Sequence, residues 1–274
     1  MKKIIAMDID GTLVSSKRVL LEETKEVLKK LQEQGNQLIL ASGRPYKGML
    51  ELAYELEMDK HHGLLVCYNG SQVWDVQTGE VLYNKPLSLE EARSVLRHLK
   101  NFKVIPMIAE NDYFLVEDVF AGKLHELDDK DIIAFEARGN GFLLKEMKDL
   151  CDIDFEPNKI LTAGEPSYLK ENCKAMSEPF ENDLSCMFTA AFYYEFTTKN
   201  VNKGNALKEI FKKGEAEMIA FGDAENDLSM FEVADISIAM GNATKEVQAK
   251  ADYVTLSNDE NGIAYALKEI LKLG

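Results

Sequence analysis

Two aspartates stand two residues apart where an apolar run near the start of the chain ends. The run reads Ile4-Ile5-Ala6-Met7-Asp8-Ile9-Asp10-Gly11-Thr12, and its apolar part predicts a buried β-strand. Residues at i and i+2 project from the same side of an extended chain, so both carboxylates should face the crevice where ligands bind in open α/β sheets. Paired carboxylates there suit acid–base or metal chemistry. The simpler interpretation is a strand followed by an acidic Asp-Gly turn.

Two further polar sets are expected at a strand end and at a helix start. Ser42-Gly43-Arg44-Pro45 follows the apolar run 37–41, and a serine hydroxyl beside a glycine N–H suits the oxygens of a phosphate group. In isolation, a serine that caps a helix is the simpler interpretation. Lys203-Gly204 stands at an expected helix start, where a cation opposes the helix dipole, so the sequence favours an anionic partner. The alternative is a lone surface lysine that is merely solvated.

A third polar set follows the apolar run 218–221. It reads Gly222-Asp223-Ala224-Glu225-Asn226-Asp227 and crowds three acidic side chains into one loop. Such crowding costs electrostatic repulsion unless solvent or a cation relieves it, and carboxylate oxygens are ligands that suit Mg²⁺. The alternative is that one or two of these acids simply favour the dipole of the helix that follows.

Apolar, strand-like runs alternate with amphipathic, helix-like runs at both ends of the chain. This alternation predicts an α/β fold with a doubly wound, mostly parallel sheet. After about residue 82 the pattern becomes α+β, with a helix opened by a capping box from Ser88 to Glu91. We therefore expect a core of residues 1–82 and 191–274 and an inserted cap domain at 83–190. The expected core strands are 4–8, 37–41, 64–68, 218–221, 236–240 and 253–256, and later core helices are expected at 226–233 and 261–273.

Composition excludes several classes of protein. The 274 residues carry a net charge of −15, which opposes binding to nucleic acid or to an anionic membrane. No apolar run reaches the ~18 residues of a membrane helix, and the first apolar run is too short for a signal peptide, so we expect a cytoplasmic protein. The four cysteines are scattered, which indicates buried, reduced thiols rather than a zinc site or disulfides. The oligomeric state stays open, and a monomer fits the sequence.

Taken in order, these sets resemble the four motifs of the haloacid dehalogenase-like phosphohydrolases. The matching residues are Asp8-x-Asp10-Gly11-Thr12, Ser42, Lys203 and Gly222-Asp223-x-x-Asn226-Asp227. Further segments are similar to those of the Cof-type subfamily, sugar-phosphate phosphatases with a large α+β cap between the second and third motifs. These segments are Ala41-Ser42-Gly43-Arg44-Pro45, Asn69-Gly70, Met240-Gly241-Asn242-Ala243 and Ala251-Asp252-Tyr253-Val254-Thr255. Ser71 and Glu260-Asn261-Gly262 depart mildly from the Cof-type pattern, outside the motif residues.

The resemblance implies a role for each motif residue. Asp8 would be the nucleophile that forms an aspartyl phosphate, and Asp10 would be the general acid and base. The Asp8 carboxylate, the Asp10 carbonyl and Asp223 would hold Mg²⁺. The groups expected to hold the phosphoryl oxygens are the backbone N–H groups of Ile9 and Gly43 and the side chains of Ser42, Lys203 and Asn226. Three residues are expected to orient these groups without contacting the phosphoryl group themselves: Thr12, Arg44 and Asp227. Asp227 would act by positioning a metal ligand or a metal-bound water.

The sequence thus predicts a phosphatase that needs Mg²⁺ and acts on a small phosphorylated metabolite, such as a sugar phosphate or a related compound. The inserted cap is expected to select the substrate, because every motif residue addresses the phosphoryl group or the metal. A phosphomutase of the same superfamily is the nearest alternative, and only the reaction product separates the two. A phosphorelay receiver also clusters aspartates around Mg²⁺ and a lysine, but on a chain less than half as long and without a cap. A non-catalytic binding protein is the remaining alternative.

Overall fold

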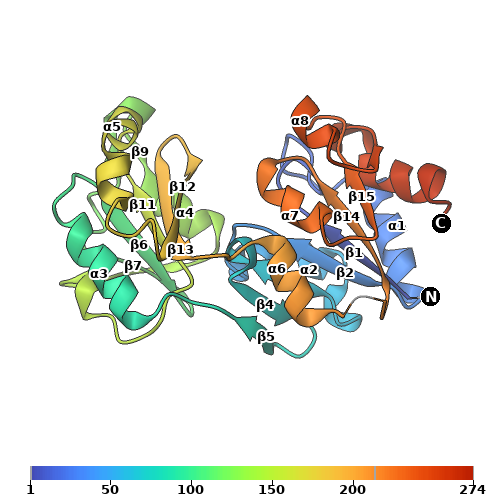
Figure 1. Ribbon diagram of the computed structural model, residues 1–274, viewed down its shortest axis with the longest axis horizontal. Coiled ribbons are helices and arrows are strands. Elements are labelled where there is room, and N and C mark those ends of the chain that lie inside the picture. Colours follow the sequence, from blue (N-terminus) through green and yellow to red (C-terminus); the bar gives the residue numbers. More distant parts are fainter. Residues whose placement is uncertain (1, 213, 274) are drawn as a thin grey trace. The chain divides into compact units, whose positions relative to one another are not determined.

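The computed structural model describes residues 2–212 and 214–273 and divides into two compact units (Figure 1). The first unit combines the residues up to Asn84 with those from Asn202 onward, and the second runs from Lys85 to Val201. The expected limits of the insert were 83 and 190. The second unit extends further, because β13 (Tyr193–Thr198) pairs with β11 (Ile160–Ala163) and β12 (Leu184–Ala190) in its own sheet.

The first unit contains an eight-stranded sheet in the order β16-β15-β14-β1-β2-β3-β4-β5. The strands from β16 to β3 pair in parallel, whereas β3, β4 and β5 pair antiparallel. In Figure 1, β1 in blue lies beside β14 in orange, although the two come from opposite ends of the sequence. The bounds are β1 Lys3–Met7, β2 Gln37–Ala41, β3 Leu64–Cys67, β4 Gln72–Asp75, β5 Val81–Asn84, β14 Glu217–Gly222, β15 Ile236–Ala239 and β16 Tyr253–Val254.

Helices cover both faces of this sheet. One apolar cluster joins Ile5 and Met7 of β1 to α1, α2 and α9, and a second joins Ile4 and Ala6 to α6, α7 and α8. This division follows from the alternation of side chains along a strand. The bounds are α1 Glu22–Glu33, α2 Lys47–Glu55, α6 Lys203–Ile210, α7 Leu228–Phe231, α8 Lys245–Gln248 and α9 Gly262–Tyr265. The predicted doubly wound, mostly parallel α/β core is therefore confirmed.

Two predicted helices differ in detail from the structure. In place of a helix over 226–233, a 3₁₀ turn at Glu225–Asp227 precedes the short α7, because the Asp227 carboxylate accepts hydrogen bonds from two backbone N–H groups just before it and tightens the turn. In place of a helix over 261–273, α9 is followed by a π-helical turn at Ala266–Ile270. The ends of the core strands lie within two residues of the predicted ones. Tyr68, which was expected in the strand 64–68, lies beyond the end of β3 in a 3₁₀ turn.

The second unit is built on a six-stranded sheet in the order β10-β7-β6-β11-β13-β12, with a separate β8-β9 pair. The helices α3 and α5 pack on one face, and α4 packs on the other. The predicted capping box is present at the start of α3, where Ser88 and Glu91 bond each other's backbone N–H groups. Remaining bounds are α3 Leu89–Leu99, α4 Ile132–Gly139, α5 Pro166–Ser177, β6 Ile105–Glu110, β7 Tyr113–Val116, β8 Lys123–Leu124, β9 Lys130–Asp131 and β10 Leu143–Glu146.

Two further expectations can be compared with the structure. Each of the four cysteines is free. The prediction that their thiols are buried holds for Cys67 but not for Cys151, Cys173 and Cys186, which are partly exposed. Among the described residues, no helix has both the length and the apolar character needed to cross a membrane.

Candidate active site

The predicted polar sets meet at one edge of the core sheet. Asp8 directly follows β1, Ser42 follows β2, and Asp223 follows β14. These three strands are neighbours and run parallel, so their carboxyl ends share an edge. The Asp8 N–H donates to the carbonyl of Phe221 (3.1 Å), which ties the end of β1 to the end of β14. The strand order, rather than the sequence spacing, therefore brings these residues together.

Lys203, the first residue of α6, is fully buried between two carboxylates. Its Nζ donates to Oδ1 of Asp8 (2.5 Å) and to Oδ1 of Asp227 (2.7 Å). Burial alone would lower the pKa of Lys203, but Asp8 and Asp227 outweigh burial, so the net direction is upward and the ammonium stays charged. The alternative interpretation of Lys203 as a solvated surface lysine is wrong.

Asp223 and Asp227 are held in different ways. Both Asp227 oxygens are in use, because Oδ1 accepts from Lys203 and Oδ2 accepts from the backbone N–H groups of Asp223 (2.9 Å) and Ala224 (3.1 Å). Asp223 Oδ1 accepts from the Thr12 hydroxyl (2.8 Å). Asp227 thus acts as a brace for the loop and for Lys203, whereas Asp223 keeps its second oxygen, Oδ2, without a protein donor among the described residues.

Gly11 is required for this close approach. Its φ is +86°, and a Cβ at this position would lie 2.4 Å from Oδ2 of Asp223. Any side chain would therefore push the Asp223 carboxylate away and would also strain the backbone. A tight turn alone would explain a glycine at position 11. The close approach of the Asp223 carboxylate is a second reason why Gly11 cannot carry a side chain.

The electrostatics of the cluster favour a cation. Oxygens of Asp8, Asp223 and Asp227 lie within 4.8 Å of one another, and Lys203 is paired with Asp8 and Asp227. Burial, reinforced by the two neighbouring aspartates, raises the pKa of Asp8 to about 7 despite the opposing effect of Lys203. Burial also raises the pKa of Asp223. Carboxylate oxygens are ligands that suit Mg²⁺, so Asp8 and Asp223 fit that ion, whereas the exposed Glu225 lies outside the cluster.

Asp10 is paired with Arg44 rather than with the buried cluster. The guanidinium donates from Nε to Oδ2 (3.0 Å) and from Nη2 to Oδ1 (2.6 Å), which is a two-point ion pair. The Asp10 side chain is about half exposed, at 53%. Its carboxylate is therefore partly open to solvent while each of its oxygens accepts a hydrogen bond from Arg44.

The remaining predicted phosphate-binding groups lie on neighbouring loops of the same unit. Ser42 is buried, and its Oγ accepts from the backbone N–H of Arg44 (3.3 Å). Ile9 is buried in a tight turn, where its carbonyl accepts from Leu13 and Val14. Gly43 packs beside Asn69, and the exposed Asn226 donates from Nδ2 to Oδ1 of the same Asn69 (3.2 Å).

Two asparagines of the site have no role in the sequence-based prediction. Asn69 receives the Asn226 amide, and Asn242 donates from Nδ2 to the carbonyl of Gly11 (2.8 Å). Both stand in segments that carry the Cof-type resemblance, Asn69-Gly70 and Met240-Gly241-Asn242-Ala243. The resemblance was the only available signal, because their partners are far away in the sequence.

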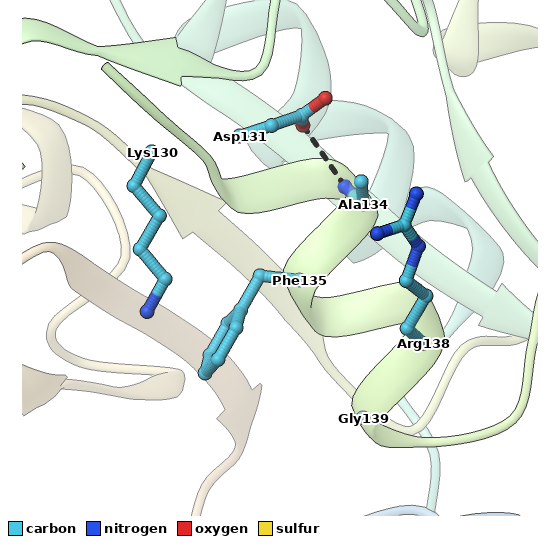
Figure 2. Close-up of a pocket in the computed structure, with 6 residues that line it drawn as sticks. All are labelled: Lys130, Asp131, Ala134, Phe135, Arg138 and Gly139. Atoms are coloured by element: carbon cyan, nitrogen blue, oxygen red, sulfur yellow. Dashed lines mark hydrogen bonds between the residues drawn. The ribbon is translucent and has the colours of Figure 1, made fainter. Parts of the chain in front are cut away.

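A separate pocket of about 540 Å³ lies on the second unit (Figure 2). Its lining includes Lys130, Phe135 and Arg138, and the ammonium of Lys130 lies 3.4 Å from the centre of the Phe135 ring. The acidic residue of the lining, Asp131, accepts from the N–H of Ala134 (3.0 Å) and so caps α4. Lys130 and Arg138 are both exposed, and exposed cations suit an anionic ligand.

Known proteins share this fold over nearly the whole chain. A crystal structure of a haloacid dehalogenase-like hydrolase from Bacteroides thetaiotaomicron covers 98% of this chain and 100% of its own, with 30% identity and a TM-score of 0.89. The sugar phosphatase BT4131, of subclass IIB of the same superfamily, covers 98% and 99% with 25% identity and a TM-score of 0.75. The phosphatase YwpJ of Bacillus subtilis is 27% identical over 98% of this chain and 100% of its own.

The site thus combines clustered carboxylates with a buried lysine at the strand ends of an α/β sheet. The family model described as haloacid dehalogenase-like hydrolase matches residues 5–267, and the chain belongs to that family. The predictions of this family, of a hydrolase and of the fold class are therefore confirmed.

Proposed function

We propose that this protein is a Mg²⁺-dependent phosphatase that hydrolyses a small phosphorylated metabolite, such as a sugar phosphate, through an aspartyl phosphate on Asp8. The observation that carries the proposal is the contact between Asp8 and the fully buried Lys203 (2.5 Å), beside Asp223. A carboxylate held by a buried ammonium at the end of a strand is fixed in direction, as a nucleophile must be. Similarity to BT4131, a sugar phosphatase, supports the substrate class.

The proposed reaction has two displacements. An Asp8 oxygen attacks phosphorus in line, the bond between phosphorus and the ester oxygen breaks, and Asp10 gives its proton to the leaving alkoxide. Water then attacks the same phosphorus, Asp10 takes a proton from that water, and the bond from phosphorus to Asp8 breaks to release inorganic phosphate. Mg²⁺, when held by Asp8, Asp223 and the Asp10 carbonyl, supplies neutralisation of charge on the transferring group.

The other residues are proposed to hold the three non-bridging phosphoryl oxygens. Lys203 supplies the positive charge, and its double contact with Asp8 and Asp227 fixes where that charge lies. The Ser42 hydroxyl, the Asn226 amide and the N–H groups of Ile9 and Gly43 are the proposed neutral donors. Thr12 and Asp227 hold Asp223 and Lys203 in place, and Arg44 holds Asp10 between turnovers.

The second unit is proposed as the cap that reads the alcohol part of the substrate. None of the groups assigned above addresses that part. The pocket with Lys130, Phe135 and Arg138 offers positive charge and an aromatic face (Figure 2), which suits a substrate that carries an anionic group besides its phosphate. A cap of this kind also excludes water during phosphoryl transfer.

The experiment is a phosphate-release assay on the purified protein with a small aryl phosphate and a panel of sugar and other metabolite phosphates. We expect slow hydrolysis of the aryl phosphate, faster hydrolysis of at least one metabolite phosphate, loss of activity in excess chelator and recovery on adding Mg²⁺. Transfer of the phosphoryl group to a second sugar hydroxyl without phosphate release would instead identify a phosphomutase. Full activity in excess chelator would remove the metal from the mechanism.

A further inference from the structure

Three consecutive residues after β3 adopt left-handed backbone conformations. The φ angles are +51° at Tyr68, +55° at Asn69 and +106° at Gly70. A positive φ is tolerated by glycine and asparagine but is a true outlier for a bulky residue such as tyrosine. Such a conformation persists only where surrounding contacts hold it, and it concentrates at functional sites. The segment therefore needs an explanation beyond chain reversal.

The contacts of this segment reach two of the proposed phosphate-binding loops. On one side, the N–H of Tyr68 donates to the carbonyl of Arg44 (3.0 Å), and the N–H of Asn69 donates to the carbonyl of Ser42 (2.9 Å). On the other side, Oδ1 of Asn69 accepts from the Asn226 amide (3.2 Å). The left-handed turn thus joins the loop after β2 to the loop after β14.

Gly70 fixes the same segment against the start of α6. A Cβ at Gly70 would lie 2.2 Å from the carbonyl of Asn202 and 3.0 Å from the backbone N of Lys203. The turn is thus packed directly against the residue pair that begins α6. Ser42, Asn226 and Lys203 come from three separate segments of the chain, and each segment contacts residues 68–70.

We propose that Asn69 is a positioning residue of the phosphoryl site: it orients the Asn226 amide and ties it to the Ser42 loop without itself contacting the substrate. The inference rests on the proposed function, because it assigns Asn226 and Ser42 to the phosphoryl oxygens. The Asn226 side-chain amide has two N–H groups on Nδ2, and one of them donates to Asn69. This bond fixes the plane of the amide and therefore the direction in which the second N–H group points. Pre-orientation of this kind lowers the reorganisation needed in the transition state.

The test is the variant Asn69→Gly, which keeps the left-handed backbone and removes only the side chain. The probes are a small aryl phosphate for kcat/KM and orthovanadate as a competitive inhibitor that resembles the transferring phosphoryl group. We expect kcat/KM to fall about tenfold and the inhibition constant of vanadate to rise by a similar factor, which is the effect of one well-placed hydrogen bond. The unfolding temperature of the variant is measured in parallel.

Asn261→Gly is the matched control. Asn261 also has a positive φ, +56°, and its Oδ1 also accepts a hydrogen bond from a sequence-distant side chain, the Thr24 hydroxyl (3.1 Å). It therefore loses the same kind of interaction in the same unit. We expect a comparable change in unfolding temperature but wild-type kcat/KM and wild-type inhibition by vanadate. Equal kinetic losses in the two variants would mean that Asn69 has only a structural role and would overturn the proposal.

A double-mutant cycle with Asn226→Ala tests the route of action. If Asn69 acts through Asn226, then Asn69→Gly has little further effect in the Asn226→Ala background. An undiminished loss in that background would overturn the proposed route. If Asn69→Gly does not fold, Asn69→Asp is used instead. Asn69→Asp keeps the shape and the acceptor oxygen but adds a negative charge, which should weaken inhibition by vanadate. Unchanged inhibition would overturn the placement of Asn69 at the site. A wild-type protein that does not hydrolyse the aryl phosphate would instead overturn the proposed function.

Discussion

Lys203 lies fully buried with its Nζ 2.5 Å from Oδ1 of Asp8, the residue that directly follows β1. A buried ammonium requires carboxylate partners, and a buried carboxylate requires a cation, so the two residues depend on each other. The contact between Lys203 and Asp8 therefore has two effects: it orients the Asp8 carboxylate, and it stabilises the charges that are buried at the edge of the sheet. Function and stability are coupled at this pair.

Removal of the lysine should destabilise the protein strongly. Lys203→Met keeps the length of the side chain but leaves Asp8 and Asp227 buried without their cation. We expect a loss of about 3–5 kcal/mol in the free energy of unfolding at neutral pH, because one partner of a buried ion network is removed. Denaturant titration measures the loss. Lys208→Met, on the exposed face of the same helix, should change the value by no more than about 0.5 kcal/mol, and equal effects for both variants would contradict the coupling.

Asp8 should make stability depend on pH in the absence of a divalent cation. Burial raises its pKa from 3.8 to about 7, so its contribution to the free energy of unfolding is fully present below about pH 4 and is lost as the pH rises through about 7. The wild type should therefore lose stability relative to Asp8→Asn across this window. The measurement is denaturant unfolding of both proteins in excess chelator at several pH values. A stability difference that does not change with pH would contradict the assignment.

Binding of Mg²⁺ should raise the unfolding temperature, because a ligand that binds only the folded state stabilises it. The crowded oxygens of Asp8 and Asp223 provide the site. We expect Asp223→Asn to abolish the shift that Mg²⁺ produces. Glu225→Gln removes an acid from the same loop but outside the cluster, and it should keep the shift. Loss of the shift in both variants would indicate nonspecific attraction by the loop rather than a defined site.

The predictions from sequence were most successful where a local pattern decides the structure. Apolar runs of four or five residues set the strand ends, and the strand ends set the places of Asp8, Ser42 and Asp223. The side-chain contacts could not be predicted from the sequence, because they depend on packing across several strands. The bond from Arg44 to Asp10 and the bond from Asn226 to Asn69 are examples of such contacts.

Helix boundaries near the site were also difficult to predict. The sequence pattern favours one helix over 226–233, but the Asp227 carboxylate bonds backward to the backbone of Asp223 and Ala224. A side chain that competes for backbone N–H groups replaces regular helix with a tighter turn. The limit of the insert at 190 reflects a similar difficulty, because the strand pairing of Tyr193–Thr198 is not visible in composition.

The pocket of the second unit should influence which substrates are preferred. Lys130→Met and Arg138→Gln each remove one cation from its lining. For phosphate esters that carry a carboxylate or a second phosphate, we expect kcat/KM to fall about tenfold, the effect of one lost charged hydrogen bond. Hydrolysis of the small aryl phosphate should be unchanged. Lys170→Met, an exposed lysine on α5 of the same unit, is the control, and uniform losses with no altered ranking of substrates would count against the pocket.

The two aspartates of the first motif should fail in different ways. Asp8→Asn removes the nucleophile with little change of shape, so turnover should fall by several orders of magnitude. Asp10→Asn keeps the nucleophile and removes the proton carrier, which should cost on the order of 10²–10⁴ in rate. Steady-state assays with a metabolite phosphate measure both values, and circular dichroism checks that both variants are folded. Near-wild-type turnover of Asp8→Asn would be incompatible with covalent catalysis by this residue.

The most direct test of the account uses Asp10→Asn with an aryl phosphate. An aryl leaving group departs without help from an acid, whereas hydrolysis of the aspartyl phosphate still needs the missing base, so the phosphoenzyme should accumulate. The measurement is an acid quench during turnover in Mg²⁺, followed by mass spectrometry of the proteolytic peptides. We predict one added phosphoryl group on the peptide that contains Asp8, and none in Asp8→Asn treated in the same way. A phosphoryl group on another residue, or no phosphorylated peptide while phosphate is being released, would contradict the central role of Asp8.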